Sequence, residues 1–378
     1  MRPYRPGGRL VLALGMAAAL VSCSSAPSDA PATPAPAATS DDDIATVDAV
    51  VERAAHTATP LLDGRVLVTG GCVIDGCGEA TDTSEVFDPA AGTFALAATM
   101  TTPRSGHSAT QLLSGDVLLV GGYAAEGQPA LASAELYEAA TGRFVEAGAM
   151  AVGRGAHAAA LLPDGSVLVS GGWIGRRTFT DTVEIWDPRT RAFTPAAPLA
   201  STRGGATATS LSSGDVLVVG GENPPAEGLR TTEIYNPGTD SWRAGPDLAV
   251  PRFKHATVST PAGEVLVIGG TSDDVTLIAT VERFAGTSFE PAGVLTEGRY
   301  KFSDAVVALP DGRLLVAGGG RRPEVYDPAA ASGTILDGVP NARTSFATAT
   351  LLPDGGTLVV GGYDDAIDLR RSAYVLRP

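Results

Sequence analysis

The sequence predicts an all-β propeller of seven blades, because one short motif recurs seven times along the chain. The motif is clearest at residues 161–172, LLPDGSVLVSGG, where a strand, a tight turn and a second strand end in a pair of glycines. Successive pairs begin 43 to 51 residues apart. Repeats of this length with strand-type sequence are typical of propeller blades. The seven pairs are Gly70-Gly71, Gly121-Gly122, Gly171-Gly172, Gly220-Gly221, Gly269-Gly270, Gly318-Gly319 and Gly361-Gly362.

Each repeat contains four segments with the composition of short strands. In the second repeat they are residues 107–113, 116–121, 134–137 and 143–146, with turn residues between them. Their β-branched content and their length fit strands. First strands carry small residues, which suits the crowded innermost position of a blade. Third and fourth strands carry aromatic residues, which we expect to pack between blades.

The two ends of the chain predict how the ring closes. The last repeat has three strand segments, at residues 345–352, 357–361 and 373–376. A fourth strand can come from the N-terminal side, around residues 45–47. One blade built from both termini would close the ring and leave no exposed edge there. The alternative is six complete blades and one incomplete blade.

These features resemble the kelch repeat, which combines a glycine pair with a Tyr or Phe on the third strand and a Trp or Phe on the fourth. The resemblance covers residues 44–378, and the glycine pair keeps its phase in every copy. The aromatic positions are less regular, with Ile335 and Leu376 as substitutes. The resemblance implies a seven-bladed kelch-type β-propeller, which agrees with the closure expected from the chain ends.

The first 22 residues have the pattern of a bacterial lipoprotein signal peptide. Arginines precede an apolar run at residues 10–20 that is too short to span a bilayer. The next residues, Leu20-Val21-Ser22-Cys23, resemble a lipobox, which implies cleavage before Cys23 and lipidation of its sulfur. Ser24 favours the outer membrane in the Gram-negative lipoproteins that this pattern resembles. The alternative is an ordinary secretory signal with an unrelated cysteine.

Residues 23–43 are expected to form the lipidated cysteine and a flexible, disordered tether. This segment is rich in Ala, Pro, Ser and Asp and cannot bury a core. We expect it to hold the folded domain, residues 44–378, off the membrane. The sequence therefore predicts an exported protein of the bacterial cell envelope that contacts the lipid membrane through Cys23.

The other two cysteines, Cys72 and Cys77, lie close together in one loop. An exported protein meets an oxidising compartment, so a disulfide between them is the favoured interpretation. A metal site is the alternative. Two thiolates without a nearby His or a second pair of cysteines do not complete a tetrahedral metal shell, so no metal is expected here.

Two charged positions recur with the blades. An arginine stands 17 residues before the glycine pair in five copies; Lys301 takes that position in the sixth, and Arg343 lies one residue further away in the seventh. A glutamate recurs on the third strand. They could form a ring of charges for an anionic ligand, but we favour bonds within or between blades, because a residue that repeats with the blade is expected to stabilise it. The arginines are Arg53, Arg104, Arg154, Arg203 and Arg252, and the glutamates are Glu85, Glu135, Glu184, Glu233, Glu282 and Glu324.

All four histidines lie 14 residues before a glycine pair, at the start of first strands. As metal ligands they would have to converge across the channel. As structural residues they would each bond local backbone, and this second interpretation is favoured. The four are His56, His107, His157 and His255.

Ligand contacts are expected where the copies differ. Loops that follow the second strands are long and variable, which marks their face of the propeller as the working one. Aromatic residues follow three of the glycine pairs, and arginines occur in two of the same loops. Together they could form an arc suited to sugar stacking or to a protein contact, although scattered solvated loop residues are an equally good interpretation. The candidates are Tyr123, Trp173, Arg176, Arg177, Tyr363 and Arg370.

The sequence assigns no catalytic residue and no cofactor. It lacks a Gly-x-Ser-x-Gly elbow, a phosphate-cradling loop and a His-Glu-x-x-His motif. A formal net charge of −15 argues against nucleic acid as a partner. We therefore expect a membrane-anchored binding protein or scaffold whose long-loop face binds a cell-envelope protein or glycan. The alternative is a sugar-modifying enzyme, similar to kelch mutarotases or epimerases and less similar to galactose oxidase, whose copper site and flanking domains find no counterpart here.

Overall fold

The protein was analysed as a computed structural model that describes residues 44–377, except 75–77, 176–177, 224–226 and 340–342. The chain divides into two units, Met1–Ala38 and Thr39–Pro378. The expected signal peptide and tether, including Cys23, lie outside the described residues, as do Cys77, Arg176 and Arg177.

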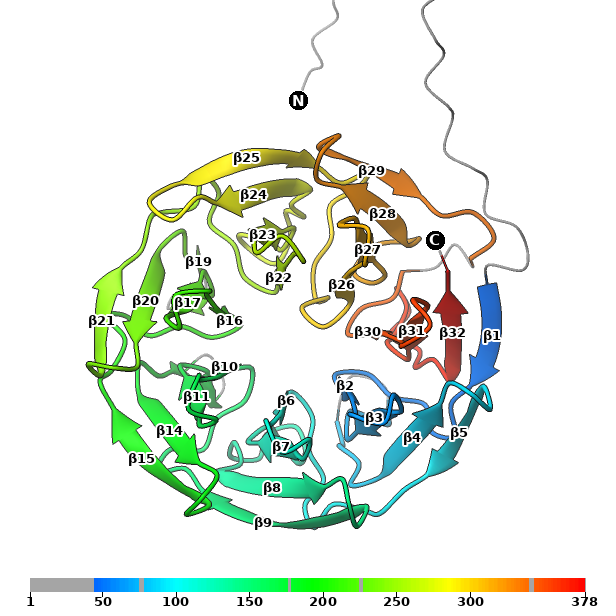
Figure 1. The fold of residues 1–378 in the computed structure, drawn as a ribbon, viewed down its shortest axis with the longest axis horizontal. Helices are drawn as coiled ribbons and strands as arrows, with labels where there is room; N and C mark the ends of the chain where they lie inside the picture. Colours follow the sequence, from blue (N-terminus) through cyan, green and yellow to red (C-terminus); the bar gives the residue numbers. More distant parts are fainter. Residues whose placement is uncertain (1–43, 75–77, 176–177, 224–226, 340–342, 378) are drawn as a thin grey trace, which may run out of the picture. The chain divides into compact units, whose positions relative to one another are not determined.

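The described strands form seven four-stranded antiparallel units arranged as blades around a common axis (Figure 1). Blades 5 and 6 are also joined by a single parallel pair, Val294 with Ser332. Blade 1 contains β2 (Thr57–Pro60), β3 (Val66–Thr69), β4 (Ser84–Asp88) and β5 (Thr93–Leu96). Blade 2 contains β6 (Ser108–Gln111), β7 (Val117–Val120), β8 (Ser133–Glu138) and β9 (Arg143–Ala149). Blade 3 contains β10 (Ala158–Leu161), β11 (Val167–Ser170), β14 (Val183–Asp187) and β15 (Ala192–Ala196).

The remaining blades follow the same order. Blade 4 contains β16 (Thr207–Ser210), β17 (Val216–Val219), β20 (Thr232–Asn236) and β21 (Ser241–Ala244). Blade 5 contains β22 (Ala256–Ser259), β23 (Val265–Ile268), β24 (Thr280–Phe284) and β25 (Phe289–Val294). Blade 6 contains β26 (Val306–Ala308), β27 (Leu314–Val316), β28 (Glu324–Asp327) and β29 (Ser332–Ile335). Blade 7 contains β30 (Thr348–Leu351), β31 (Thr357–Val360), β32 (Ser372–Leu376) and β1 (Ile44–Asp48). Two short hairpins, β12 (Trp173–Gly175) with β13 (Thr178–Phe179) and β18 (Glu222–Asn223) with β19 (Glu227–Gly228), extend from blades 3 and 4.

The second strand of each blade forms the centre of the core. β7, with sequence VLLV, is buried at all four positions, and β17 and β31 repeat this pattern. Strands buried on both faces need continuous apolar sequence, which explains why these segments do not alternate. Third and fourth strands add paired rings, such as Phe87 with Phe94 and Tyr235 with Trp242, each at a centroid distance of 4.9 Å. The predicted packing role of these aromatics is confirmed.

The predicted closure is also confirmed. β1 pairs antiparallel with β32 from Ile44 opposite Leu376 to Asp48 opposite Ser372, so both ends of the chain build blade 7 (Figure 1). This strand pairing covers the edge of β32 that would otherwise be open for pairing with another chain.

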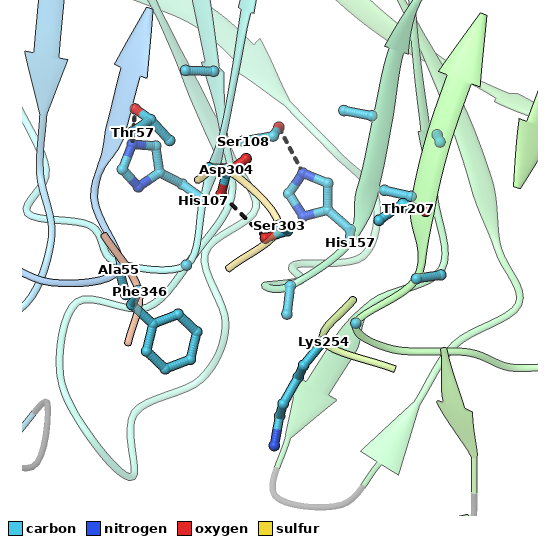
Figure 2. Close-up of a pocket in the computed structure, with 18 of the residues that line it drawn as sticks. Ala55, Thr57, His107, Ser108, His157, Thr207, Lys254, Ser303, Asp304 and Phe346 are labelled. Atoms are coloured by element: carbon cyan, nitrogen blue, oxygen red, sulfur yellow. Dashed lines mark hydrogen bonds between the residues drawn. The ribbon is translucent and has the colours of Figure 1, made fainter. Parts of the chain in front are cut away.

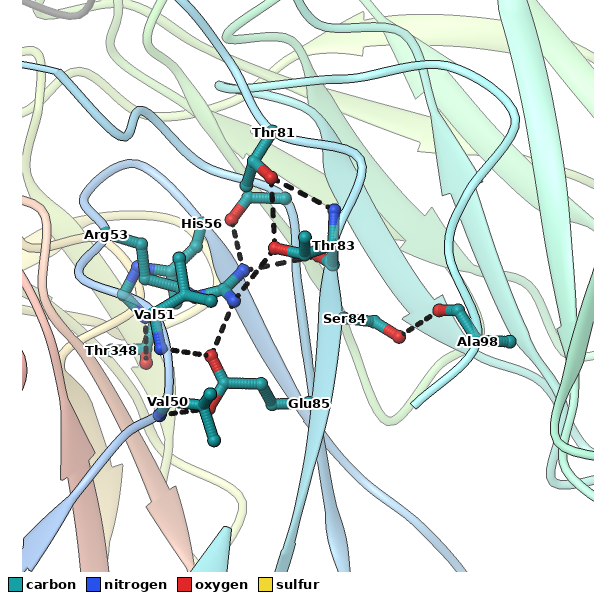
Figure 3. Close-up of polar contacts among 11 residues, drawn as sticks. Val50, Val51, Arg53, His56, Thr81, Thr83, Ser84, Glu85, Ala98 and Thr348 are labelled. Carbon is teal, nitrogen blue, oxygen red and sulfur yellow. Dashed lines mark hydrogen bonds and ion pairs between the residues drawn. The ribbon is translucent and has the colours of Figure 1, made fainter. Parts of the chain in front are cut away.

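The recurring arginine and glutamate form a buried pair within each blade, as favoured above. In blade 1, Arg53 Nη2 lies 2.6 Å from Glu85 Oε1, and Arg53 Nη1 donates to the Gly70 carbonyl at 2.6 Å (Figure 3). Glu85 also accepts hydrogen bonds from the amides of Val50 and Val51. The pair thus ties the segment that enters a blade to the third strand. Matching pairs are Arg104–Glu135, Arg154–Glu184, Arg203–Glu233, Arg252–Glu282 and Arg299–Glu324.

The assignment of Lys301 to this arginine position is wrong. In blade 6 the buried partner of Glu324 is Arg299, whose Nε lies 2.7 Å from Glu324 Oε1. Arg299 stands 19 residues before Gly318, whereas the other arginines stand 17 before their glycine. The extra residues form a turn closed by the Ala305 amide on the Phe302 carbonyl, so counting back from the glycine pair selects the wrong residue.

Candidate functional site

A closed ring of backbone hydrogen bonds surrounds one end of the central channel. Its seven members, one per blade, lie just before the first strands, and each has a positive φ between 46° and 62°. The amide of each member donates to the carbonyl of the member in the preceding blade, at 2.7 to 3.3 Å, and the first donates to the last. We call these residues the mouth ring. They are Ala55, Gly106, Ala156, Gly205, Lys254, Lys301 and Phe346.

The mouth ring is small on four consecutive blades and large on three. Glycine or alanine occupies blades 1 to 4, whereas Lys254, Lys301 and Phe346 follow one another on blades 5 to 7. Lys254 and Lys301 are the only lysines in the chain. Both line the channel cavity together with Phe346, so the mouth has one positively charged, aromatic side.

The Lys254 ammonium lies between aromatic rings and a carboxylate. Its Nζ is 5.9 Å from the centre of the Trp173 ring and 5.0 Å from that of Phe253. Asp274 Oδ1 accepts from the same Nζ at 2.6 Å. Trp173 in turn packs edge-on against Phe179, with centroids 6.2 Å apart. A cation over aromatic faces in a partly desolvated place is a favourable arrangement.

Lys301 lies in a second aromatic group. Its Nζ donates to the Tyr363 hydroxyl at 2.8 Å and lies 4.9 to 5.5 Å from the ring centres of Tyr300, Phe346 and Tyr363. Phe346 and Tyr363 also contact each other, with centroids 5.7 Å apart. Burial lowers the pKa of Lys301, but the Tyr363 hydrogen bond and the neighbouring phenols outweigh it and leave the pKa raised. The side chain therefore stays charged at neutral pH.

Behind the mouth, the first strands enclose a cavity of about 340 Å³. Its wall consists mainly of Ala, Thr and Ser side chains, with His107 and His157 among them (Figure 2). Lys254 and Phe346 point toward the mouth, away from these histidines. Asp304 is the one acidic residue among the residues that line the cavity in the placed part of the chain. Solvent reaches Asp304 through the channel, yet protein surrounds it, and this burial raises the pKa of its carboxyl.

The histidines are structural, although their partners differ from those expected. Their Nε2 atoms bond hydroxyl groups of the preceding blade, not backbone of their own. His157, for example, lies 2.8 Å from the Ser108 hydroxyl. Burial lowers the pKa of His56, His157 and His255 to about 3, and that of His107 well below its usual value. They are neutral at physiological pH.

The structure places three of the predicted ligand residues at the channel mouth. Tyr123, Trp173 and Tyr363 form backbone bridges with residues that directly precede mouth-ring members. Trp173 and Tyr363 contact the two lysines, whereas the Tyr123 hydroxyl donates to the Trp173 carbonyl at 2.9 Å. Burial raises the pKa of Tyr123 to about 12. Arg370 pairs with Asp364 of its own loop at 2.7 Å.

Cys72 is disulfide-bonded and fully buried. Both other cysteines, Cys23 and Cys77, lie outside the described residues. The pairing of Cys72 with Cys77 therefore stays a prediction.

Sequence reasoning missed the residues that give the mouth its charge, namely Lys254, Lys301 and Asp274. A signal was present, because the position before the first strand is small in most copies and the only two lysines interrupt that pattern in neighbouring copies. The arc was placed on blades 7, 1, 2 and 3, whereas the cationic side of the mouth ring lies on blades 5 to 7.

Comparison with known proteins supports the repeat assignment. The Kelch motif matches residues 154–200 and 204–249, which are blades 3 and 4. The chain is a kelch-repeat propeller. No curated protein matches its sequence. Among solved structures, this kelch propeller is similar to a fungal alcohol oxidase with catalytic diversity among the AA5 family, in complex with copper. The TM-score is 0.71 at 18% identity, over 88% of this chain and 76% of the oxidase.

That similarity extends to the fold alone. Within the placed segments of the kelch propeller, no three His, Cys, Asp or Glu side chains gather where one ion could bind. The histidines are separated by blades and hold hydroxyl groups. These residues do not fit a copper centre, and no chemistry is derived through one. In residues 44–377, apart from the gaps given above, no helix has the length and hydropathy to cross a bilayer.

Proposed function

We propose that this kelch propeller is a lipid-anchored protein of the bacterial cell envelope that binds a glycan at the mouth of its channel. The observation that carries the proposal is the side of the mouth ring formed by Lys254, Lys301 and Phe346, with Trp173 and Tyr363 beside them. Aromatic faces next to hydrogen-bonding cations suit the apolar faces and hydroxyl groups of sugars. The partly enclosed cavity behind them gives a concave site, as ligand binding requires.

The binding test uses tryptophan fluorescence, since Trp173 is at the mouth while Trp186 is fully buried in blade 3. Titration of the purified protein with neutral and acidic sugars is expected to change the emission in a saturable way. Trp173→Phe should remove this change, and Trp242→Phe, on the outer strand of blade 4, is the matched control. If no sugar alters the emission or releases heat in calorimetry, glycan binding is refuted, and a protein partner on the same face becomes the function to test.

The anchor is tested separately. Cys23→Ser is expected to abolish labelling with a radioactive fatty acid and to move the protein from the membrane fraction to the soluble fraction. Cys72→Ser serves as the control, because it removes a cysteine from the propeller and leaves the lipobox intact. Fatty-acid labelling of the Cys23→Ser variant would refute the anchor, whatever the outcome of the sugar titrations.

A sugar mutarotase or epimerase is the second candidate. The observation that favours it is Asp304, a carboxyl group inside the channel whose raised pKa suits proton transfer. The test is an NMR assay of anomer exchange for sugars that bind. Exchange above the uncatalysed rate that Asp304→Asn abolishes, with binding retained, would establish the enzyme, and exchange at the uncatalysed rate would exclude it for those sugars.

A further inference from the structure

The Lys254 ammonium is held by a carboxylate that solvent can reach. Asp274 lies 2.6 Å from Lys254 Nζ, and its side chain is 52% exposed, compared with 15% for Lys254. Asp274 has a positive φ of 63°, a conformation that costs a non-glycine residue free energy. The neighbouring Asp273 fixes the turn, because its Oδ1 accepts hydrogen bonds from the amides of Val275 and Thr276. The turn therefore does not depend on Asp274 for its shape.

Lys301 has no comparable counterion. Its Nζ donates to the neutral Tyr363 hydroxyl, and it forms no ion pair with any residue that the structure places. Lys254 and Lys301 are neighbours in the mouth ring, so an unpaired cation lies on the blade next to an exchangeable ion pair. This concentration of positive charge contrasts with the net charge of −15 for the whole chain.

We infer that the channel mouth binds the carboxylate of an acidic sugar and that Asp274 is a built-in competitor for that carboxylate. The inference rests on the glycan-binding function proposed above and names its ligand class. On binding, the sugar carboxylate replaces Asp274 at Lys254 and also meets the charge of Lys301. Charge-assisted hydrogen bonds to a carboxylate are stronger than those to neutral groups. The apolar face of the sugar packs against the neighbouring aromatic rings.

Displacement of Asp274 is feasible for two reasons. Ion pairs that reach solvent contribute little net stability, so exchange of one carboxylate for another costs little. The two lysines are held by adjacent backbone positions of one hydrogen-bonded ring, which limits the entropy lost when a ligand bridges them.

The test compares D-glucuronate with D-glucose, which lacks the carboxylate, by calorimetry on the purified protein. Glucuronate is expected to bind and glucose to bind more weakly. Asp274→Asn should tighten glucuronate by about two- to fivefold, the gain expected when an exposed ion pair no longer competes. Lys301→Met should weaken it by about tenfold or more. Asp365→Asn is the matched control, because Asp365 pairs with Arg343 in the corresponding loop of blade 7, and it should leave affinity unchanged.

The scarcity of lysine provides a direct second readout. Reductive ¹³C-methylation keeps the charge and labels only Lys254, Lys301 and the chain's amino terminus. Lys254→Arg and Lys301→Arg assign the two side-chain signals. Asp274→Asn should shift the Lys254 signal before any ligand is added, and glucuronate should then shift both lysine signals, whereas Asp365→Asn should shift neither.

The outcomes separate this inference from the function it rests on. Equal affinity for glucose and glucuronate, or no gain in Asp274→Asn, overturns the inference and leaves glycan binding in place. If neither sugar binds to the wild type or to Asp274→Asn and no lysine signal moves, both are overturned. Tighter glucuronate binding in Asp274→Asn, together with movement of both lysine signals, supports both.

Discussion

The amide of Lys301 donates a 2.9 Å hydrogen bond to the carbonyl of Lys254. The only two lysines of the chain are therefore consecutive members of one backbone ring, although 46 residues separate them in the sequence. Because every blade contributes one link to the ring, the packing of the whole propeller sets the spacing of the two side-chain attachment points. A site on such a rigid support needs little reorganisation to bind.

The first prediction concerns the buried arginine of each blade. Arg104→Met should lower the free energy of unfolding by about 3–5 kcal/mol, because it leaves the Glu135 carboxylate buried without its cation. Chemical denaturation measures this loss. The matched variant is Arg65→Met, whose pair with Asp63 is exposed at both ends, and it should cost less than about 1 kcal/mol. Equal losses for the two variants would contradict the structural role of the buried pair.

The second prediction concerns acid. His255 stays neutral in the folded protein with a pKa of about 3, whereas an unfolded histidine binds a proton below about pH 6.5. The unfolded state therefore takes up protons first, and stability falls as the pH drops from 6.5 toward 3. Each such histidine contributes about 1.4 kcal/mol per pH unit within that window.

His255→Phe tests this dependence with a natural precedent, since Phe302 holds the equivalent position in blade 6 and also packs against a glycine of the preceding blade. The lost hydroxyl partner, Thr207, keeps its bond to Thr257 at 2.6 Å. The variant's stability should fall less steeply between about pH 6.5 and pH 4 in urea titrations. An unchanged slope would show that this histidine is not the proton-linked group.

The sequence was sufficient for the blades because each blade repeats one set of local requirements. The glycine pair, the apolar second strand and the paired aromatics are all reached within a single repeat, so their period predicted strands and closure. The buried pairs could be inferred from the same recurrence. Blade 6 marks the limit, because extra residues between Arg299 and Gly318 shift the count and disguise Lys301 as a structural arginine substitute.

The charged mouth could not be derived in this way. Its contacts join different blades: Lys254 meets Trp173 from two blades away, and Lys301 meets Tyr363 from the next blade. No periodic pattern connects residues that depart from the repeat. Only the breaks in an otherwise small position pointed to them, and the geometry of the ring was needed to show that the breaks are adjacent.

The third prediction concerns the seat of Trp173. A Cβ added to Gly204 would lie 1.9 Å from the Trp173 ring, so Gly204→Ala must displace the indole. We expect a changed tryptophan emission, a weaker near-ultraviolet dichroism and a loss of about 1–3 kcal/mol of stability. Gly175→Ala, in the same hairpin as Trp173, meets nothing closer than 3.9 Å and is the control. Matching spectra for Gly204→Ala and the wild type would contradict this packing.

The last prediction concerns closure of the ring. β1 forms five residue pairs with β32, from Ile44 to Asp48, and Val47 packs against the core between blades 7 and 1. A chain that starts at residue 44 should keep the stability of the full protein. A chain that starts at residue 49 loses these pairs and should be less stable by several kcal/mol, on the order of 3–5, because apolar burial and strand hydrogen bonds are both removed. It also exposes the edge of β32, so self-association should rise with concentration. Thermal unfolding and light scattering measure the two effects, and a synthetic peptide of residues 39–48 should restore stability to the shorter chain. If the two truncated chains unfold at the same temperature, β1 is dispensable and the ring is closed by blade packing alone.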